Sequence, residues 1–101
     1  MTTTLPTLDQ LRAMSREQVT AAFAAWLDTQ PRDKTYRYCD TKGCPMASFG
    51  YAIASDKCWG AGGYTLSFDG AEVGIPIECS TALYRSRTYG ALADCLTGRD
   101  K

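Results

Sequence analysis

Histidine does not occur anywhere in the sequence of 101 residues. Its absence excludes a Ser-His-Asp or Cys-His arrangement and any imidazole acid or base, although carboxylates, lysine or tyrosine could still transfer protons. The phosphate-binding pattern G-x-x-x-x-G-K-[ST] is also absent. The glycine-rich run 60–63 precedes a predicted strand, whereas the dinucleotide fingerprint needs a strand before it and a helix after it. We therefore expect a protein that is not an enzyme and needs no cofactor.

A net charge is lacking as well, because 11 basic residues balance 11 acidic ones. No global field attracts nucleic acid or an anionic membrane, so any charge-driven binding has to be local. No apolar run approaches the roughly 20 residues of a membrane-spanning helix. Residues 1–6 have neither the basic nor the apolar region of a secretory signal. The sequence predicts a cytoplasmic protein that makes no membrane contact.

Cysteine occurs five times, an odd number that argues against a closed set of disulfides. In the cytoplasm we expect these thiols to be reduced and most of them to be small buried side chains. A cysteine-based zinc or redox protein stays open as an alternative. The zinc ligands would be Cys39, Cys44, Cys58 and Cys79, although no C-x-x-C pair is present. Cys44 would be the reactive thiol, because the start of a helix lowers a thiol pKa.

Two capping boxes in succession predict the first two helices. In each box a hydroxyl accepts a hydrogen bond from the first turn and a Gln or Glu side chain reaches back. The boxes are 7–10 and 15–18. The first predicts a short turn of helix, and the second precedes an apolar stripe at helical spacing that Pro31 ends. The stripe consists of Val19, Ala22, Phe23, Trp26 and Leu27.

Two further helices are predicted from their ends. Cys44 and Pro45 have the form of an N-cap and a first helical residue, because proline lacks the amide that the first turn leaves unpaired. This helix is expected to run to about Ala54. Thr88 is a good N-cap for a last helix, and Gly98 provides its end. Residues 79–87 are predicted as a loop.

Residues 64–77 predict a β-hairpin. The pair Asp69-Gly70 is typical of a two-residue type I′ turn. This turn places Phe68 opposite Ala71 and Leu66 opposite Val73, with the apolar side chains on one face. The chain length indicates one domain covering residues 1–101, with residues 1–6 flexible. The predicted fold is a small α+β domain in which the antiparallel hairpin (about 64–77) packs against three or four helices.

Cations and tyrosines are mixed in two segments where no apolar periodicity requires burial. Such a mixture favours a protein interface, because Tyr and Arg are enriched among binding hot spots. The predicted partner-binding residues are Arg32, Lys34, Tyr36, Arg37 and Tyr38 in the first segment and Arg85 and Arg87 in the second, which also holds Tyr84 and Tyr89. A single-stranded nucleic acid would suit the same residues. The neutral net charge and the lack of a recognition motif make nucleic acid the weaker alternative.

Three short stretches resemble small uncharacterised proteins of phages and prophages. They are Tyr36-x-Tyr38 with Asp40, Cys44-Pro45-x-Ala47-x-Phe49, and Thr88-Tyr89-Gly90-Ala91-Leu92. Compact proteins of that origin often look like anti-CRISPR or other anti-defence inhibitors, which act by occupying a host complex. Many of these inhibitors are acidic mimics of DNA, a pattern from which this neutral chain departs. The resemblance implies an inhibitor that sterically blocks a host protein complex, such as a CRISPR effector, in the host cytoplasm.

From these observations we expect a small non-enzymatic interaction protein. The alternatives are the cysteine-based zinc or redox protein and a small nucleic-acid-binding module. The resemblance assigns no functional residues, so the predicted binding surface depends on the tyrosine and arginine clusters alone.

Overall fold

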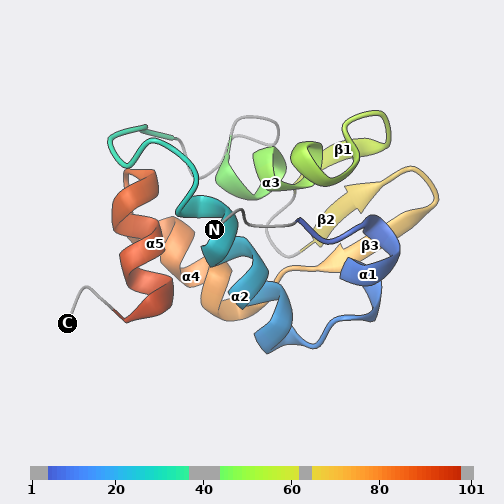
Figure 1. Ribbon diagram of the computed structural model, residues 1–101, viewed down its shortest axis with the longest axis horizontal. Helices are drawn as coiled ribbons and strands as arrows, with labels where there is room; N and C mark the ends of the chain where they lie inside the picture. Colours follow the sequence, from blue (N-terminus) through green and yellow to red (C-terminus); the bar gives the residue numbers. More distant parts are fainter. Residues whose placement is uncertain (1–4, 37–43, 62–64, 99–101) are drawn as a thin grey trace.

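The computed structural model describes residues 5–36, 44–61 and 65–98, which form five helices and a three-stranded antiparallel sheet. The elements are α1 (Leu8–Ala13), α2 (Arg16–Leu27), α3 (Pro45–Ala54), β1 (Cys58–Ala61), β2 (Thr65–Phe68), β3 (Ala71–Gly74), α4 (Ile77–Arg85) and α5 (Tyr89–Thr97). Figure 1 shows the sheet at one end of the molecule and α4 and α5 at the other. The predicted α+β class is confirmed, with more helices than the three or four expected.

The helix ends follow the capping signals of the sequence. Thr7 and Ser15 each form a complete capping box, with Gln10 and Gln18 as the reciprocal partners. Cys44 caps α3 and Pro45 is its first residue, as predicted. At the end of α5, Gly98 has a φ of 77°, the left-handed conformation that glycine adopts without a steric cost. Of the segment 1–6, only residues 5 and 6 are described, so its flexibility stays a prediction.

The hairpin has the predicted register. Phe68 lies opposite Ala71 and Leu66 opposite Val73. Leu66, Phe68 and Val73 are buried on one face, whereas Glu72 on the other face is exposed. The predicted end of the hairpin at residue 77 is wrong, because β3 ends at Gly74 and Ile77 already begins α4. Residue 64 lies outside the described residues. A two-residue turn and alternating burial are therefore sufficient to set this pairing.

A third strand, β1, extends the predicted hairpin into a sheet. It pairs with β2 in an antiparallel sense, and the register shifts between Cys58 and Gly60, where Gly60 has a φ of 122°. This irregularity interrupts the alternation by which a strand is recognised in a sequence. The face of β1 that carries Cys58 packs against α3, while Trp59 is 63 % exposed.

The predicted loop at 79–87 is wrong, because most of it belongs to α4. This helix begins after Pro76, which makes no side-chain capping bond. Its buried face consists of Cys79, Ser80, Ala82 and Leu83. Three of these side chains are small, so the buried face of the helix does not stand out as a stripe of large apolar residues. The helix also lacks a capping side chain at its start.

Aromatic side chains join the helices at the centre of the molecule. The ring of Phe49 on α3 lies 5.3 Å from the ring of Phe23 and 5.6 Å from that of Trp26, both on α2. Trp26 in turn lies 6.2 Å from Tyr89 on α5. These tilted contacts lie within the range that aromatic pairs prefer.

In the described part of the chain, no helix is both long and apolar enough to cross a membrane.

Replacing Gly70 by valine is expected to destabilise the protein by about 1–2 kcal/mol, because Gly70 has a φ of 77° that a β-branched residue adopts only with strain. No atom lies within 4 Å of a Cβ built at Gly70, so crowding does not contribute. Gly74→Val is the matched control, since its Cβ is equally free and its φ is not positive. Urea denaturation should show a lower midpoint for Gly70→Val than for Gly74→Val, and equal midpoints would contradict the turn assignment.

Candidate functional site

The structure brings together the two segments that the sequence predicts as a binding surface. Residues 31–36, which follow α2, lie against the start of α5 (Figure 1). Thr35 and Thr88 form an isolated antiparallel bridge. Three backbone hydrogen bonds surround it, from Tyr36 N to Arg87 O (3.3 Å), from Tyr89 N to Lys34 O (2.9 Å) and from Gly90 N to Arg32 O (2.9 Å). The two clusters therefore form one continuous region held by the backbone.

Tyr36 connects this region to the core. Its hydroxyl donates a 2.8 Å hydrogen bond to the carbonyl of Leu83, and its ring meets Tyr89 edge-on at 6.1 Å. Burial raises the pKa of Tyr36 to about 12, because the phenolate would lose its contact with water. The aromatic side chain that the sequence suggests as a binding anchor is thus half-buried. Its hydroxyl and one ring edge are used inside the fold.

Arg32 is likewise engaged within the protein. Its guanidinium donates a 2.7 Å hydrogen bond to the Asp94 carboxylate, which raises the pKa of Arg32. Gly90 passes directly beside it, so that a Cβ added at Gly90 would lie 2.9 Å from the Cβ of Arg32. Arg32 therefore positions the segment on α5, and its charge is shared with a carboxylate.

The side chains that do face solvent gather where residues 31–36 meet the junction of α4 and α5. Tyr84 is 66 % exposed, and Arg87 lies beside it, donating a 3.3 Å hydrogen bond to the Tyr84 carbonyl. Lys34 and Arg85 are also exposed, and the Lys34 ammonium lies 5.1 Å from the centre of the Tyr89 ring. We call the set Arg32, Lys34, Tyr84, Arg85 and Arg87 the basic corner. The predicted Arg37 and Tyr38 lie outside the described residues.

The cysteines occupy packing and capping positions. Cys44, Cys58 and Cys79 are buried, and Cys95 is partly buried. Desolvation raises the pKa of Cys58, and it raises that of Cys79 to about 11, so burial disfavours the thiolate form of both. Within the three described ranges, no group of three or more Cys, Asp or Glu side chains could hold a metal ion. The fourth candidate ligand, Cys39, lies outside those ranges.

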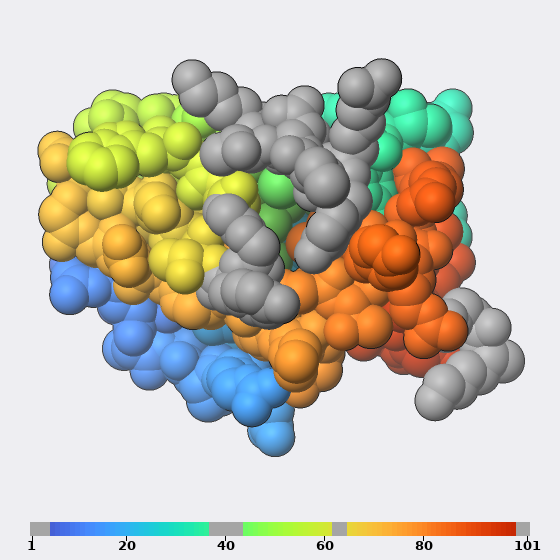
Figure 2. Space-filling view, turned by 180° about the vertical axis from the view of Figure 1, so that it is seen from behind, coloured from blue at the N-terminus to red at the C-terminus, as the bar shows by residue number. Residues whose placement is uncertain are grey.

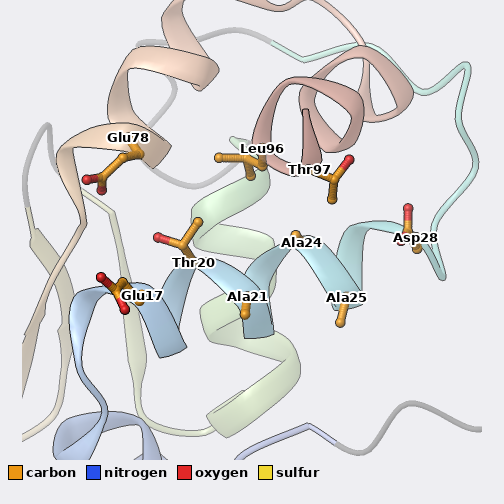
Figure 3. Close-up of a pocket in the computed structure, with 9 residues that line it drawn as sticks. All are labelled: Glu17, Thr20, Ala21, Ala24, Ala25, Asp28, Glu78, Leu96 and Thr97. Carbon is orange, nitrogen blue, oxygen red and sulfur yellow. The ribbon is translucent and has the colours of Figure 1, made fainter. Parts of the chain in front are cut away.

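A groove that the sequence does not predict runs between α2 and α5, with α4 at one end (Figure 3). Its volume is about 550 Å³. The helix α2 contributes five side chains and its C-cap residue Asp28 a sixth, α4 contributes Glu78, and α5 contributes Leu96 and Thr97. A second cavity of about 540 Å³ shares Thr20, Glu78 and Leu96 and continues the groove toward α4. We refer to both as the α2/α5 groove.

Small side chains are the reason why this groove escapes sequence analysis. Ala21 and Ala25 lie away from the apolar stripe of α2 that packs into the core, where alanine is an ordinary helix surface residue. Only the position of α5 turns these residues into the wall of a cavity.

Figure 2 shows the back of the molecule, where the start of α5, in orange-red, lies beside the teal segment that follows α2.

Comparison with protein-family models, with curated proteins and with solved structures finds no match to this chain. The predicted phage origin and anti-CRISPR class therefore gain no support from relatives and stay predictions from the sequence.

Proposed function

We propose that this chain is a non-enzymatic interaction protein that binds a partner protein through the basic corner. The observation that supports this proposal is the 66 % exposure of the Tyr84 side chain beside the guanidinium of Arg87. An exposed tyrosine next to arginine provides the two side-chain types that dominate binding hot spots. The backbone beneath them is tied to residues 34–36 by hydrogen bonds, which lowers the entropy lost on binding.

A protein partner suits this surface better than nucleic acid. Arg32 is paired with Asp94, so the corner combines cations with a carboxylate instead of presenting cations alone. A phosphate backbone gains affinity from each cation it meets and loses affinity near a carboxylate. A protein surface can instead pair with both signs of charge while the tyrosine ring is buried.

The resemblance noted in the sequence gives the partner to test first. A domain of this size bound to a larger assembly acts by occupying a surface that another molecule needs, and we propose a host defence complex of the CRISPR type as that assembly. The inhibitor role depends on the resemblance alone, whereas the interaction surface depends on the structure.

Substitutions in the basic corner are expected to weaken partner binding without unfolding the protein. Tyr84→Ala should reduce affinity by about 1–3 kcal/mol, and the double charge reversal Arg85→Glu/Arg87→Glu should slow association. The matched control is Arg12→Glu/Lys57→Glu, a double reversal at exposed positions outside the corner. Partners are captured from a host lysate with the tagged protein and identified, and calorimetry with the purified partner then measures each affinity.

Two results would contradict this proposal. If both corner variants bind the purified partner as well as the parent protein does, another surface is used, and the exposed faces at Trp59 and Glu72 become the next candidates. If the protein instead binds a labelled single-stranded oligonucleotide with a steep dependence on salt, the nucleic-acid alternative is favoured. Circular dichroism of each variant shows whether the fold is retained.

A further inference from the structure

The floor of the α2/α5 groove is apolar. Ala21, Ala24 and Ala25 line it from α2 and Leu96 lines it from α5. Short alanine side chains leave a wide, shallow depression instead of a deep pocket. An apolar group placed there would lose contact with water along the whole length of the groove, which favours its binding.

Three threonines line the α2/α5 groove, and Thr81 lines only the second cavity. The two that line the cavity between α2 and α5 do not offer their hydroxyl protons to a bound molecule. The Thr20 hydroxyl donates a 2.9 Å hydrogen bond to the carbonyl of Arg16. The Thr97 hydroxyl likewise donates to the carbonyl of Ala93, at 2.8 Å. Both bonds lie within the residue's own helix, a common arrangement for threonine in helices. The cavity between α2 and α5 therefore lacks the side-chain donors that an anion or a carbonyl-rich ligand would need.

Charge in the groove is confined to its ends and is negative. Glu17 and Glu78 lie at one end and Asp28 at the other (Figure 3). Among the described lining residues there is no lysine or arginine. Two guanidinium groups act on these carboxylates from outside the lining. Arg16 lies 3.1 Å from Glu78, but both side chains are more than half exposed and the pair is screened by water. At the other end, Arg32 interacts electrostatically with Asp28. A cationic group is therefore favoured at the Glu17 and Glu78 end.

We propose that the α2/α5 groove binds an amphipathic helix of a partner protein, with small apolar residues on one face and lysine or arginine on its flanks. The part of α2 between Glu17 and Asp28 spans roughly 16 Å at 1.5 Å per residue, which matches about three turns of a bound helix. Alanine walls allow two helices to pack at the short end of the usual interaxial distance. This surface differs from the basic corner, so the inference goes beyond the proposed function.

A helix fits better than an extended peptide because of the backbone. The longest wall of the groove is α2, and along the middle of this helix the amides and carbonyls are already paired within the helix. An extended peptide binds by adding to a sheet edge, and no strand lines this groove. A helical segment satisfies its own backbone and needs from the groove only apolar contact and charge complementarity.

The first test uses two designed helical peptides as probes. One has alanine and leucine on one face and lysine on both flanks, and the other has glutamate in place of every lysine. Nuclear magnetic resonance titration of the labelled protein should show saturable shifts of the amides of Thr20, Ala24 and Leu96 with the lysine peptide. The glutamate peptide should bind at least about fivefold more weakly, because it meets the carboxylates of the groove.

Two matched pairs of variants locate the binding site. Ala21→Arg introduces bulk and positive charge into the groove and should lower the affinity for the lysine peptide at least about tenfold. Its control, Ala52→Arg, changes an exposed position of α3 and should leave that affinity unchanged. The double variant Glu17→Gln/Glu78→Gln should lower the affinity for the lysine peptide about threefold to fivefold in low salt. Glu72→Gln, at an exposed position of β3 outside the groove, should have no effect. Circular dichroism confirms that each variant is folded.

Three outcomes would overturn this inference. They are the absence of saturable shifts with the lysine peptide, equal affinity for the two peptides, and shifts that map outside the groove. Sedimentation of the protein alone adds a fourth: if the parent chain is a dimer that Ala21→Arg dissociates, the groove binds a second copy. None of these outcomes depends on the basic-corner variants at Tyr84, Arg85 and Arg87, because these residues do not line the groove.

Discussion

Replacing Phe49 by alanine is expected to lower the free energy of unfolding by about 3–5 kcal/mol. The Phe49 side chain is completely buried, and its ring contacts those of Phe23 and Trp26. Removing it leaves a cavity where α3 meets α2, and the neighbouring aromatic rings are too rigid to fill that space. Because small domains unfold at a total cost of about 5–15 kcal/mol, this single change removes a large fraction of the stability.

Urea denaturation followed by circular dichroism measures the loss. Phe49→Leu is the control, since leucine keeps much of the apolar volume and should cost clearly less than alanine. If alanine and leucine shift the midpoint equally, or if both leave it unchanged, Phe49 does not occupy the centre of the core and the packing of α3 on α2 is incorrect.

Gly50→Leu is expected to produce the next largest effect, a loss of about 3 kcal/mol from overpacking. A Cβ added at Gly50 would lie 2.8 Å from the Cys58 sulfur and 2.8 Å from a methyl carbon of Leu66. Both neighbours are buried and belong to the sheet that α3 covers, so the new side chain has to push the helix away from β1 and β2. Gly50 is therefore required where it stands, although glycine is a poor helix former.

Ala52→Leu, at an exposed position of the same helix, is the control for this second experiment. Its side chain points into solvent, and we expect a change within about 0.5 kcal/mol. A Gly50→Leu protein with the same urea midpoint as the Ala52→Leu protein would show that α3 does not approach the sheet as closely as the structure indicates.

Local signals allowed much of the fold to be predicted. The two capping boxes, the Cys44-Pro45 start of α3, the turn at Gly70 and the Gly98 end of α5 each depend on a few neighbouring residues. Such signals are complete within a short stretch of sequence. The strand β1 has an irregular register, which interrupts the alternation that identifies a strand. The helix α4 lacks a capping side chain, and its remaining signals are only Glu78 in the first turn, Arg85 in the last turn and a buried face of mostly small side chains.

The candidate sites depend on contacts between distant segments, which limits what the sequence can predict. The two Tyr and Arg clusters were recognisable, but their joining by the Thr35 and Thr88 bridge was not. Tyr36 looked like a surface residue because nothing near it in the sequence shows that its hydroxyl meets Leu83. The α2/α5 groove left no signal at all, since alanine on a helix surface is equally compatible with open solvent.

The contact between α2 and α5 has a consequence for how this protein is made. Trp26 is covered in part by Tyr89, and residues 32–36 are paired with 87–90, so the core needs a segment that is synthesised after the sheet. Bringing such distant segments together carries an entropic cost that local helices do not face, which slows folding. A nascent chain that has emerged only through the sheet therefore exposes part of its aromatic core. Synthesis of α5 is the step after which the domain can close.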